Sequence, residues 1–349
     1  MTLIAAVVLA AAGVFSSQSY EKPMEIGNYD VTIDLPSGKA ASVNYVKFMG
    51  RRLAIDRTEL KAGEKKSVSF TARVPGPYTT RPNDEKKNRK LEIELFTTAP
   101  KVVPNPKART IYLCGDSTVT DQRHEPWASW GQILPAFVKK GWSATNFARS
   151  GLALKTFEEE GRLKRIFEHL RKDDWVVIQF GHNDQKIKGE EAENGYTRRL
   201  NEWIDQIRAK GAFVVLVTPV ERRNFNKRTG AQMCKTLEKY AEAVKAVSAA
   251  KGVPFVDLND ASYRMQGKMG AEGSIRLQRN ENGQNVDNTH HNIYGAYEMA
   301  RIVAAGLAKI PTIGDAIRDA YRTFDPEKPD PEPEIPPSGT TDLTKPEGS

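Results

Sequence analysis

Apolar and polar residues alternate in several short runs within the first 100 residues. The clearest runs are residues 29–35, 68–74 and 91–95. A period of two predicts β-strands that bury one face, and segments with glycine and proline separate the runs as turns do. Short strands at this spacing are typical of a β-sandwich. We therefore expect a small antiparallel β-sandwich domain over residues 20–100, followed by a proline-containing linker over residues 101–108.

The pattern changes near residue 109, where short continuous apolar runs begin to alternate with segments of helical length. The apolar runs are 111–114, 175–180, 213–217 and 255–258, and the helical segments are 157–171, 196–210, 229–251 and 293–309. Strands that are apolar on both faces and alternate with helices predict a parallel sheet covered on each side. We expect a three-layer α/β/α domain over residues 109–322. Its strands should end at one edge of the sheet, where open α/β sheets bind ligands.

The two ends of the chain differ in composition from both expected domains. Residues 3–15 are apolar and uncharged, and short polar residues follow them. Because this run is too short for a membrane-spanning helix, it predicts a secretory signal peptide over residues 1–19, with a strand or helix of the mature fold as the alternative. Residues 323–349 are rich in proline and acidic residues, which indicates a disordered tail.

The charge of the chain is divided unevenly. The 349 residues include 52 Lys or Arg and 44 Asp or Glu, for a formal net charge of +8. Residues 325–349 carry a net charge of −5, which leaves +13 on the residues before them. Such a basic body is compatible with nucleic acid, anionic lipid or an acidic polymer as partner. The two cysteines, Cys114 and Cys234, cannot form a disulfide framework, and their pairing with each other stays open.

Three sequence blocks place nucleophilic and acid–base side chains beside predicted strand ends or the last helix. Gly-Asp-Ser-Thr contains Ser117, Gly-His-Asn-Asp contains Asn183, and Asp287 and His290 stand three residues apart before the last predicted helix. A serine hydroxyl needs a base to take its proton, a histidine titrates in the suitable range, and a carboxylate orients the imidazole. The set fits acyl transfer, with Asn183 and backbone N–H groups near Gly151 as donors to the oxyanion.

These blocks resemble the signature blocks of SGNH/GDSL hydrolases, and the longer strings resemble the rhamnogalacturonan acetylesterase branch of carbohydrate esterases. The strings are IYLCGDSTVTD, VVIQFGHNDQ, TPVERR and VDNTHHNIYGA, within about residues 109–308. The resemblance implies a flavodoxin-like SGNH domain in which Ser117 is the nucleophile, His290 the base and Asp287 the carboxylate that orients it. It also implies that Ser117, Gly151 and Asn183 line the oxyanion hole. The branch often has an arginine directly after the glycine of the second block, and this chain lacks it.

Candidate substrate contacts lie in and near a basic stretch, residues 222–228, which follows a strand end. Arg222 and Arg223 are expected to bind uronate carboxylates, because a guanidinium can hold a carboxylate through two hydrogen bonds. A solvated run of charges is the alternative. Trp127 is a third candidate, since an indole edge can stack on a sugar ring, although its spacing from Trp130 also fits core packing.

We predict an exported serine acetylesterase, periplasmic or extracellular, that removes acetyl groups from a pectic polysaccharide such as rhamnogalacturonan. We expect no metal, because the adjacent His290 and His291 rarely share an ion and no third ligand has the right spacing. We also expect no cofactor, no nucleic-acid partner, no membrane span and a monomer. The alternatives are an SGNH esterase for another acetylated glycan such as xylan, and a non-catalytic glycan-binding protein that acts through the β-domain.

Overall fold

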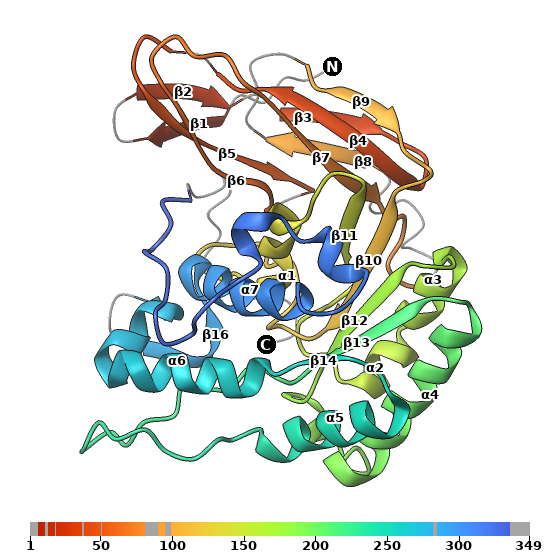
Figure 1. Cartoon of the computed structure of the whole chain (residues 1–349). Coiled ribbons are helices and arrows are strands. Elements are labelled where there is room, and N and C mark those ends of the chain that lie inside the picture. Colours follow the sequence, from red (N-terminus) through yellow and green to blue (C-terminus); the bar gives the residue numbers. More distant parts are fainter. Residues whose placement is uncertain are drawn as a thin grey trace.

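A parallel sheet lies at the centre of the larger part of the molecule (Figure 1). The computed structural model describes residues 6–10, 13–17, 19–36, 38–49, 51–80, 90–94, 99–281 and 285–335. Within these residues the sheet has the order β11-β10-β12-β13-β14, with every pair parallel. Its strands are β10 (Arg109–Gly115), β11 (Trp142–Asn146), β12 (Trp175–Gln179), β13 (Phe213–Val217) and β14 (Phe255–Val256). The predicted parallel sheet is confirmed.

Each face of this sheet carries its own hydrophobic core, because successive strand residues point to opposite faces. Ile111 and Leu113 pack on one face, and Tyr112 and Cys114 on the other. The first face is covered by α1 (Trp130–Ile133), α6 (Leu258–Gly273) and α7 (Ile293–Leu307). The second is covered by α2 (Leu154–Glu159), α3 (Arg162–His169), α4 (Thr197–Ala209) and α5 (Glu238–Lys251). The strands are buried on both sides, as the continuous apolar runs predicted.

Short helical turns and a hairpin complete the α/β unit in the described part of the chain. The turns are η2 (Leu134–Phe137), η3 (Asp184–Lys186), η4 (Ala192–Tyr196), η5 (Ser274–Leu277), η6 (Ile313–Ala316) and η7 (Asp319–Tyr321). The hairpin pairs β15 (Gln278–Glu281) with β16 (Asn285–His291) in antiparallel fashion and leads directly into α7. None of the described helices is long and apolar enough to cross a membrane.

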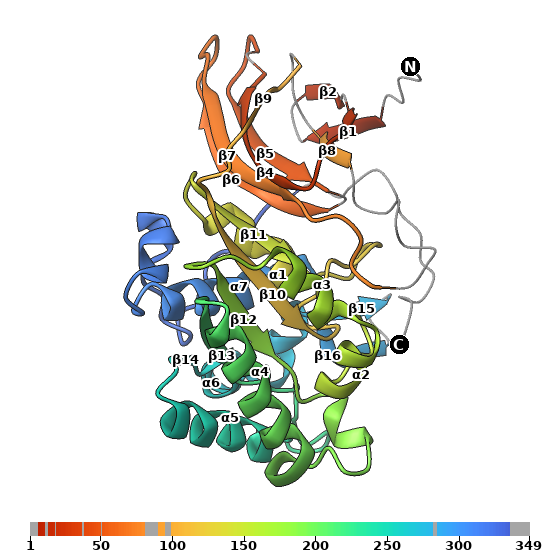
Figure 2. The same cartoon turned by 90° about the vertical axis from the view of Figure 1, so that its right-hand side faces the viewer.

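Two antiparallel sheets formed by residues before 105 lie against one end of the α/β unit in both views (Figures 1 and 2). The first, among the described residues, has the order β3-β8-β5-β6, from β3 (Ser19–Pro23), β5 (Ser42–Phe48), β6 (Arg52–Leu60) and β8 (Lys90–Glu94). The second has the order β7-β4-β9, from β4 (Gly27–Asp34), β7 (Ser67–Val74) and β9 (Lys101–Pro104). Val31 of the second sheet and Phe48 of the first belong to one hydrophobic cluster, so the two sheets share a core.

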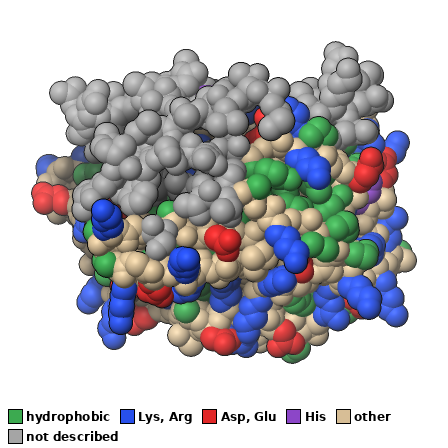
Figure 3. All heavy atoms as spheres, turned by 90° about the horizontal axis from the view of Figure 1, so that it is seen from above, with side chains coloured by type: hydrophobic (Ala, Val, Ile, Leu, Met, Phe, Trp, Pro, Cys, Tyr) green, Lys and Arg blue, Asp and Glu red, His purple; other side chains and the backbone are tan. Residues whose placement is uncertain are grey.

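Parts of the predicted linker and of the predicted tail belong to the folded body. Residues 101–104 form β9, whose backbone pairs with β4, so this part of the linker belongs to the second sheet. Residues 323–335 were expected to be disordered, yet acidic side chains there find partners on the body, as in the ion pairs Arg301–Asp330 and Arg276–Glu332. Residues 336–349 lie outside the described residues. Basic side chains elsewhere are spread over the surface, as the face seen from above illustrates (Figure 3).

The amino-terminal run and the cysteines can also be placed. Ala6–Ala10 (β1) and Gly13–Ser17 (β2) pair as an antiparallel hairpin, and the signal peptide over residues 1–19 stays a prediction. Cys114 is buried in the central strand β10, whereas Cys234 is exposed, and neither forms a disulfide.

Candidate active site

Ser117 lies in a tight loop at the carboxyl end of β10. The strand ends at Gly115, where a Cβ atom would stand 2.4 Å from a side-chain carbon of Val119, so only glycine lets the chain fold back this closely. The next residue, Asp116, is buried, and its Oδ1 accepts hydrogen bonds from the backbone N (2.9 Å) and Oγ1 (2.7 Å) of Thr118. These contacts fix the loop and leave the Ser117 hydroxyl facing away from the sheet's core, toward β16.

Ser117, His290 and Asp287 form a continuous row of hydrogen bonds. Nε2 of His290 lies 2.8 Å from Oγ of Ser117, and its Nδ1 lies 2.8 Å from Oδ2 of Asp287. Oδ1 of Asp287 also accepts hydrogen bonds from the backbone N–H groups of Thr289 and His290, at 2.8 and 3.0 Å. Burial opposes ionisation of Asp287, but the hydrogen bond and charge of His290 and these N–H groups outweigh it and hold its pKa at about 2. The three residues chosen from the sequence therefore meet, with the carboxylate ionised.

The predicted oxyanion donors come from the loops on either side of the Ser117 loop. Strands β11 and β12 flank β10, and Gly151 and Asn183 follow them. Gly151 has φ +82°, a backbone conformation that favours glycine. Nδ2 of Asn183 donates to the carbonyl of Leu152 at 3.1 Å, which leaves its second amide hydrogen for the site. No hydrogen bond within the described residues engages the N–H groups of Ser117 or Gly151.

Asp184 also contributes to this geometry, although the sequence reasoning did not single it out. Its Oδ1 accepts a hydrogen bond from the N–H of Leu154, and its Oδ2 accepts one from the N–H of Gly181, both at 2.9 Å. The carboxyl group thereby ties together the loops that carry Gly151 and Asn183. Burial, with a smaller contribution from the charge of nearby Asp116, raises its pKa to about 7. An acidic residue directly after Asn183 at a strand end was the signal in the sequence.

Two other histidines near the site are buried and packed. Nδ1 of His182 lies 3.4 Å from Oδ2 of Asp116, behind the Ser117 loop. Burial, helped by the charge of neighbouring His290, lowers the pKa of His291 to about 3, so this side chain is neutral. Neither ring contacts the Ser117 hydroxyl, which leaves His290 as the imidazole in position to take its proton.

The two arginines predicted to bind substrate have different surroundings. Arg222 reaches toward the site: its Nε donates to Oγ1 of Thr289 at 3.3 Å, and its Nη1 donates to Oγ1 of Thr236 at 3.2 Å. Arg223 instead binds neighbouring groups of the protein: its guanidinium donates to Ser274 Oγ (3.0 Å), Asn288 Oδ1 (3.2 Å) and the carbonyl of Ala271. Arg222 can therefore still meet a substrate carboxylate, whereas the donors of Arg223 are already engaged.

Trp127 has a different position from the one that sugar stacking would require. The side chain is only 4% exposed, and its ring meets the imidazole of His290 edge-on, with centroids 5.1 Å apart at 71°. Little of the indole surface is left for a sugar ring. The structure places Trp127 against His290, the expected catalytic base. The spacing of Trp127 from Trp130 could not have indicated this contact.

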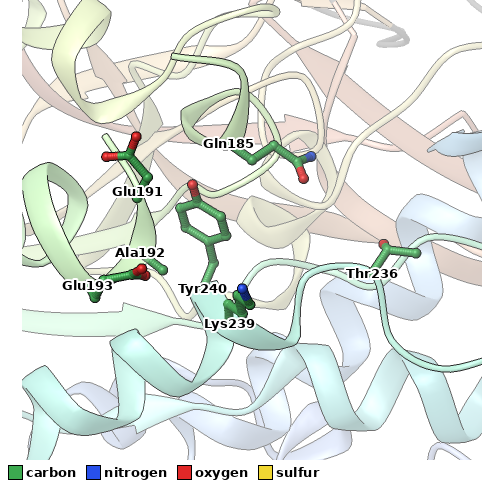
Figure 4. A pocket seen from close by; sticks show the side chains of 7 residues that line it. All are labelled: Gln185, Glu191, Ala192, Glu193, Thr236, Lys239 and Tyr240. Carbon is green, nitrogen blue, oxygen red and sulfur yellow. The ribbon is translucent and has the colours of Figure 1, made fainter. Parts of the chain in front are cut away.

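A pocket of about 260 Å³ opens beside these loops and is lined by Gln185, Glu191, Ala192, Glu193, Thr236, Lys239 and Tyr240 (Figure 4). Gln185 belongs to η3, two residues after Asn183, and Thr236 accepts a hydrogen bond from Arg222, so two lining residues connect the pocket to the surroundings of the candidate site. Its lining mixes carboxylates, an amide, an ammonium group and the phenol ring of Tyr240. Among the described residues, no group of three or more His, Cys, Asp or Glu side chains is placed to hold a metal ion.

Comparison with known proteins adds independent evidence. Residues 113–275 match the GDSL-like Lipase/Acylhydrolase family. The chain is 38% identical to rhamnogalacturonan acetylesterase RhgT of Bacillus subtilis (strain 168), over 57% of this chain and 90% of that protein. It is 36% identical to the probable rhamnogalacturonan acetylesterase YesY of the same organism, over 58% of this chain and 94% of that protein. The family match ends before Asp287 and His290. The evidence that these two residues lie beside Ser117 is the pair of 2.8 Å contacts in the structure.

A solved structure resembles more of the chain than the α/β unit. The Bacillus subtilis protein YxiM aligns with a TM-score of 0.52 at 23% identity and covers 86% of each chain. The aligned part of this chain is longer than the α/β domain over residues 109–322, so the similarity in fold extends into the amino-terminal sheets.

Proposed function

Since this chain belongs to the GDSL-like lipase/acylhydrolase (SGNH) family and is a carbohydrate esterase, we propose that it removes O-acetyl groups from rhamnogalacturonan by a Ser-His-Asp acyl-enzyme mechanism. The observation that carries the mechanism is the row of two 2.8 Å contacts from Ser117 through His290 to Asp287. The substrate is supported by the identity to relatives whose names state that activity.

The first half-reaction transfers the acetyl group to the enzyme. Nε2 of His290 takes the proton of Ser117 as Oγ attacks the acetyl carbonyl carbon. The carbonyl oxygen becomes an oxyanion that accepts hydrogen bonds from the N–H groups of Ser117 and Gly151 and from Nδ2 of Asn183. When the intermediate collapses, the bond to the sugar oxygen breaks and the imidazolium gives its proton to that oxygen. Asp287 stabilises the imidazolium throughout this half-reaction.

The second half-reaction releases acetate. His290 takes a proton from a water molecule, which attacks the acetyl-Ser117 ester and forms a second oxyanion at the same donors. The collapse of this intermediate breaks the bond to Oγ, and the imidazolium returns a proton to Ser117. The cycle needs only water as co-reactant.

Charge supports an acidic polysaccharide as the substrate. Arg222 lies next to Thr289, close to the row of Ser117, His290 and Asp287, and its guanidinium is the cationic group that supports this substrate. The pocket of Figure 4 adds no net positive charge, because Lys239 shares its lining with Glu191 and Glu193. A guanidinium binds a carboxylate more strongly than a neutral hydroxyl group, because the hydrogen bonds are charge-assisted. The galacturonate units of a pectic backbone supply such carboxylates, and an acetylated xylan backbone does not.

Three broader assignments belong to this proposal. We assign the apolar run 3–15 to a signal peptide, and the protein therefore to the periplasm or the outside of the cell, where pectic polymers are met. We interpret the two antiparallel sheets, with their shared core around Val31, as a β-sandwich domain. The protein is taken to act as a monomer.

The function is tested by acetate release from a panel of substrates. Acetylated rhamnogalacturonan, acetylated xylan and 4-nitrophenyl acetate are compared by kcat/KM at one pH and ionic strength. The proposal expects the highest value for rhamnogalacturonan among the two polymers. A higher kcat/KM for xylan would indicate that the substrate is a neutral acetylated glycan. Binding of pectin with no acetate release from any substrate would favour a glycan-binding protein.

Replacing Arg222 by alanine is expected to raise KM for acetylated rhamnogalacturonan about 10-fold, the loss of one charge-assisted contact. KM for 4-nitrophenyl acetate should stay unchanged, since that ester carries no carboxylate. The difference in KM between the variant and the wild type should shrink as salt is added, because an ion pair that solvent can still reach is screened.

The control is Arg223→Ala. Because Arg223 is bound to Ser274 and Asn288, its loss should lower Tm and leave the ratio of the two KM values as in the wild type. If both variants raised KM for the polymer equally, Arg222 would have no special contact with substrate.

A further inference from the structure

Two consecutive arginines of the amino-terminal sheets, Arg51 and Arg52, are buried where β6 meets the α/β unit. They are 5% and 1% exposed. A buried guanidinium is costly unless its donors are satisfied, so each must have a defined set of partners. None of the steps proposed above uses either residue.

Three groups of one short segment of the α/β unit, residues 122–127, bind the guanidinium of Arg51. Its Nη1 donates to the carbonyls of Gln122 (3.0 Å) and Trp127 (2.8 Å), and its Nη2 pairs with the carboxylate of Glu125 at 2.5 Å. The backbone carbonyl of Arg51 accepts a hydrogen bond from Nε2 of Gln132 at 3.1 Å. One guanidinium thus gathers both ends and the middle of this segment.

The start of the segment is connected to the nucleophile. Nε2 of Gln122 donates to the carbonyl of Ser117 at 2.8 Å. Oγ of Ser129, two residues beyond the segment, donates to the same carbonyl at 2.6 Å. The carbonyl of Ser117 is therefore bound by one residue of the segment that Arg51 holds and by one residue that closely follows it.

The end of the segment is connected to the base. The carbonyl of Trp127 binds Arg51, while its ring packs edge-on against the imidazole of His290. The next residue, Ala128, donates its N–H to the carbonyl of His291 at 3.0 Å. A shift of residues 122–127 would therefore move both the Trp127 ring that packs against His290 and the Gln122 amide that binds the carbonyl of Ser117.

We propose that Arg51 is a positioning residue for the esterase reaction, through which the amino-terminal sheets keep Ser117 and His290 aligned. The inference rests on the proposed function in taking these two residues as the reacting pair. It also gives the sheets a role other than glycan binding. In the described part of the two sheets, the aromatic side chains are buried or half-buried.

Asp56 provides a matched comparison on the same strand. It is also buried at the interface, where its Oδ2 accepts hydrogen bonds at 2.7 Å from the hydroxyl groups of Tyr297 and Tyr321. These contacts join β6 to α7 and η7 and do not involve residues 117–129. Asp56→Ala therefore weakens the same interface without acting on the segment that Arg51 holds.

The test measures kcat and KM for 4-nitrophenyl acetate, together with Tm, for the full chain and its Arg51→Ala, Arg51→Lys and Asp56→Ala variants. Arg51→Ala is expected to lower kcat about 10- to 100-fold at nearly unchanged KM, as a small misplacement of reacting groups does. Arg51→Lys should fall between Arg51→Ala and the wild type, because an ammonium group can pair with Glu125 but cannot span both carbonyls. Asp56→Ala should lower Tm and leave kcat unchanged. Guanidinium ions at non-denaturing concentration should restore part of the kcat of Arg51→Ala, and sodium chloride at equal ionic strength should not.

Two results would overturn the positioning role. One is a folded Arg51→Ala, or Arg51→Lys if the alanine variant does not fold, with the kcat of the wild type. The other is an equal loss of kcat in Asp56→Ala, which would mean that any weakening of the interface has this effect. Ser117→Ala in the same assay distinguishes failure of the positioning role from failure of the proposed function. If the proposed function were wrong, activity would survive the change of Ser117; if only the positioning role were wrong, Ser117→Ala would be inactive while the Arg51 variants kept the wild-type kcat.

Discussion

Alanine in place of Ser117 is expected to lower kcat for acetate release by on the order of 10⁴-fold or more, because no other hydroxyl group contacts the imidazole of His290 in the described residues. The loss should be the same on acetylated rhamnogalacturonan and on 4-nitrophenyl acetate, since both pass through the same acyl-enzyme. The measurement is single-turnover acetate release, with mass spectrometry to show that the wild type forms an acetyl adduct and the variant does not.

Folding should be unaffected by Ser117→Ala. The backbone contacts of the loop, from Gln122 and Ser129 to the Ser117 carbonyl, do not need the hydroxyl group. Ser67→Ala, on the amino-terminal sheet, is the control for the loss of a serine hydroxyl and should keep full activity. Acetate release that persisted at the wild-type rate in Ser117→Ala would remove the acyl-enzyme mechanism.

The parallel sheet and the three residues of the row could be predicted because their signals are local. Buried strands such as β12 are continuous apolar runs, and the residues that follow strands of one parallel sheet meet at one edge. Ser117 lies two residues after the end of β10, and Asn183 lies four residues after the end of β12. Asp287 and His290 lie on the hairpin strand β16 instead. Their spacing indicated that they face one cavity, and the resemblance to SGNH hydrolases linked them to Ser117.

The errors in the helices have equally local causes that the apolar pattern does not report. The predicted helix 157–171 is interrupted at Gly161, whose φ of +77° separates α2 from α3. The predicted helix 229–251 begins only at Glu238, because the buried carboxylate of Glu221 binds the N–H groups of Thr236 and Leu237 and holds the chain before α5 as a loop. The N–H groups directly before α5 are thus bound by the side chain of a residue distant in the sequence.

The surroundings of Arg51, Arg223 and Trp127 could not be predicted, since they depend on contacts between distant parts of the chain. Nothing near Arg51 in the sequence indicates that it meets Glu125, and the basic run 222–228 does not distinguish the arginine that faces the site from the one that faces α6. The sequence alone does not indicate whether a long charged or amphipathic side chain is buried, because its burial depends on which distant segments pack against it.

The exchange Asp287→Asn is expected to lower kcat by about 10⁴-fold at neutral pH, through the wrong tautomer of His290. Oδ1 of Asp287 accepts two backbone N–H groups, so the amide oxygen of an asparagine would take that place. Its NH₂ group would then face Nδ1 of His290 and donate to it, leaving the proton on Nε2, where the imidazole cannot accept one from Ser117.

The pH dependence gives this prediction a second readout. With its pKa at about 2, the Asp287 carboxylate of the wild type stays ionised above about pH 3, so its own protonation does not lower the activity at mildly acidic pH. In Asp287→Asn the residual rate should instead keep rising with pH, because attack then depends on hydroxide or the serine alkoxide. The control is Asp319→Asn, an exposed carboxylate paired with Lys139, which should match the wild type. A loss of less than about 10-fold in Asp287→Asn, with the pH profile of the wild type, would show that the carboxylate does not fix the tautomer.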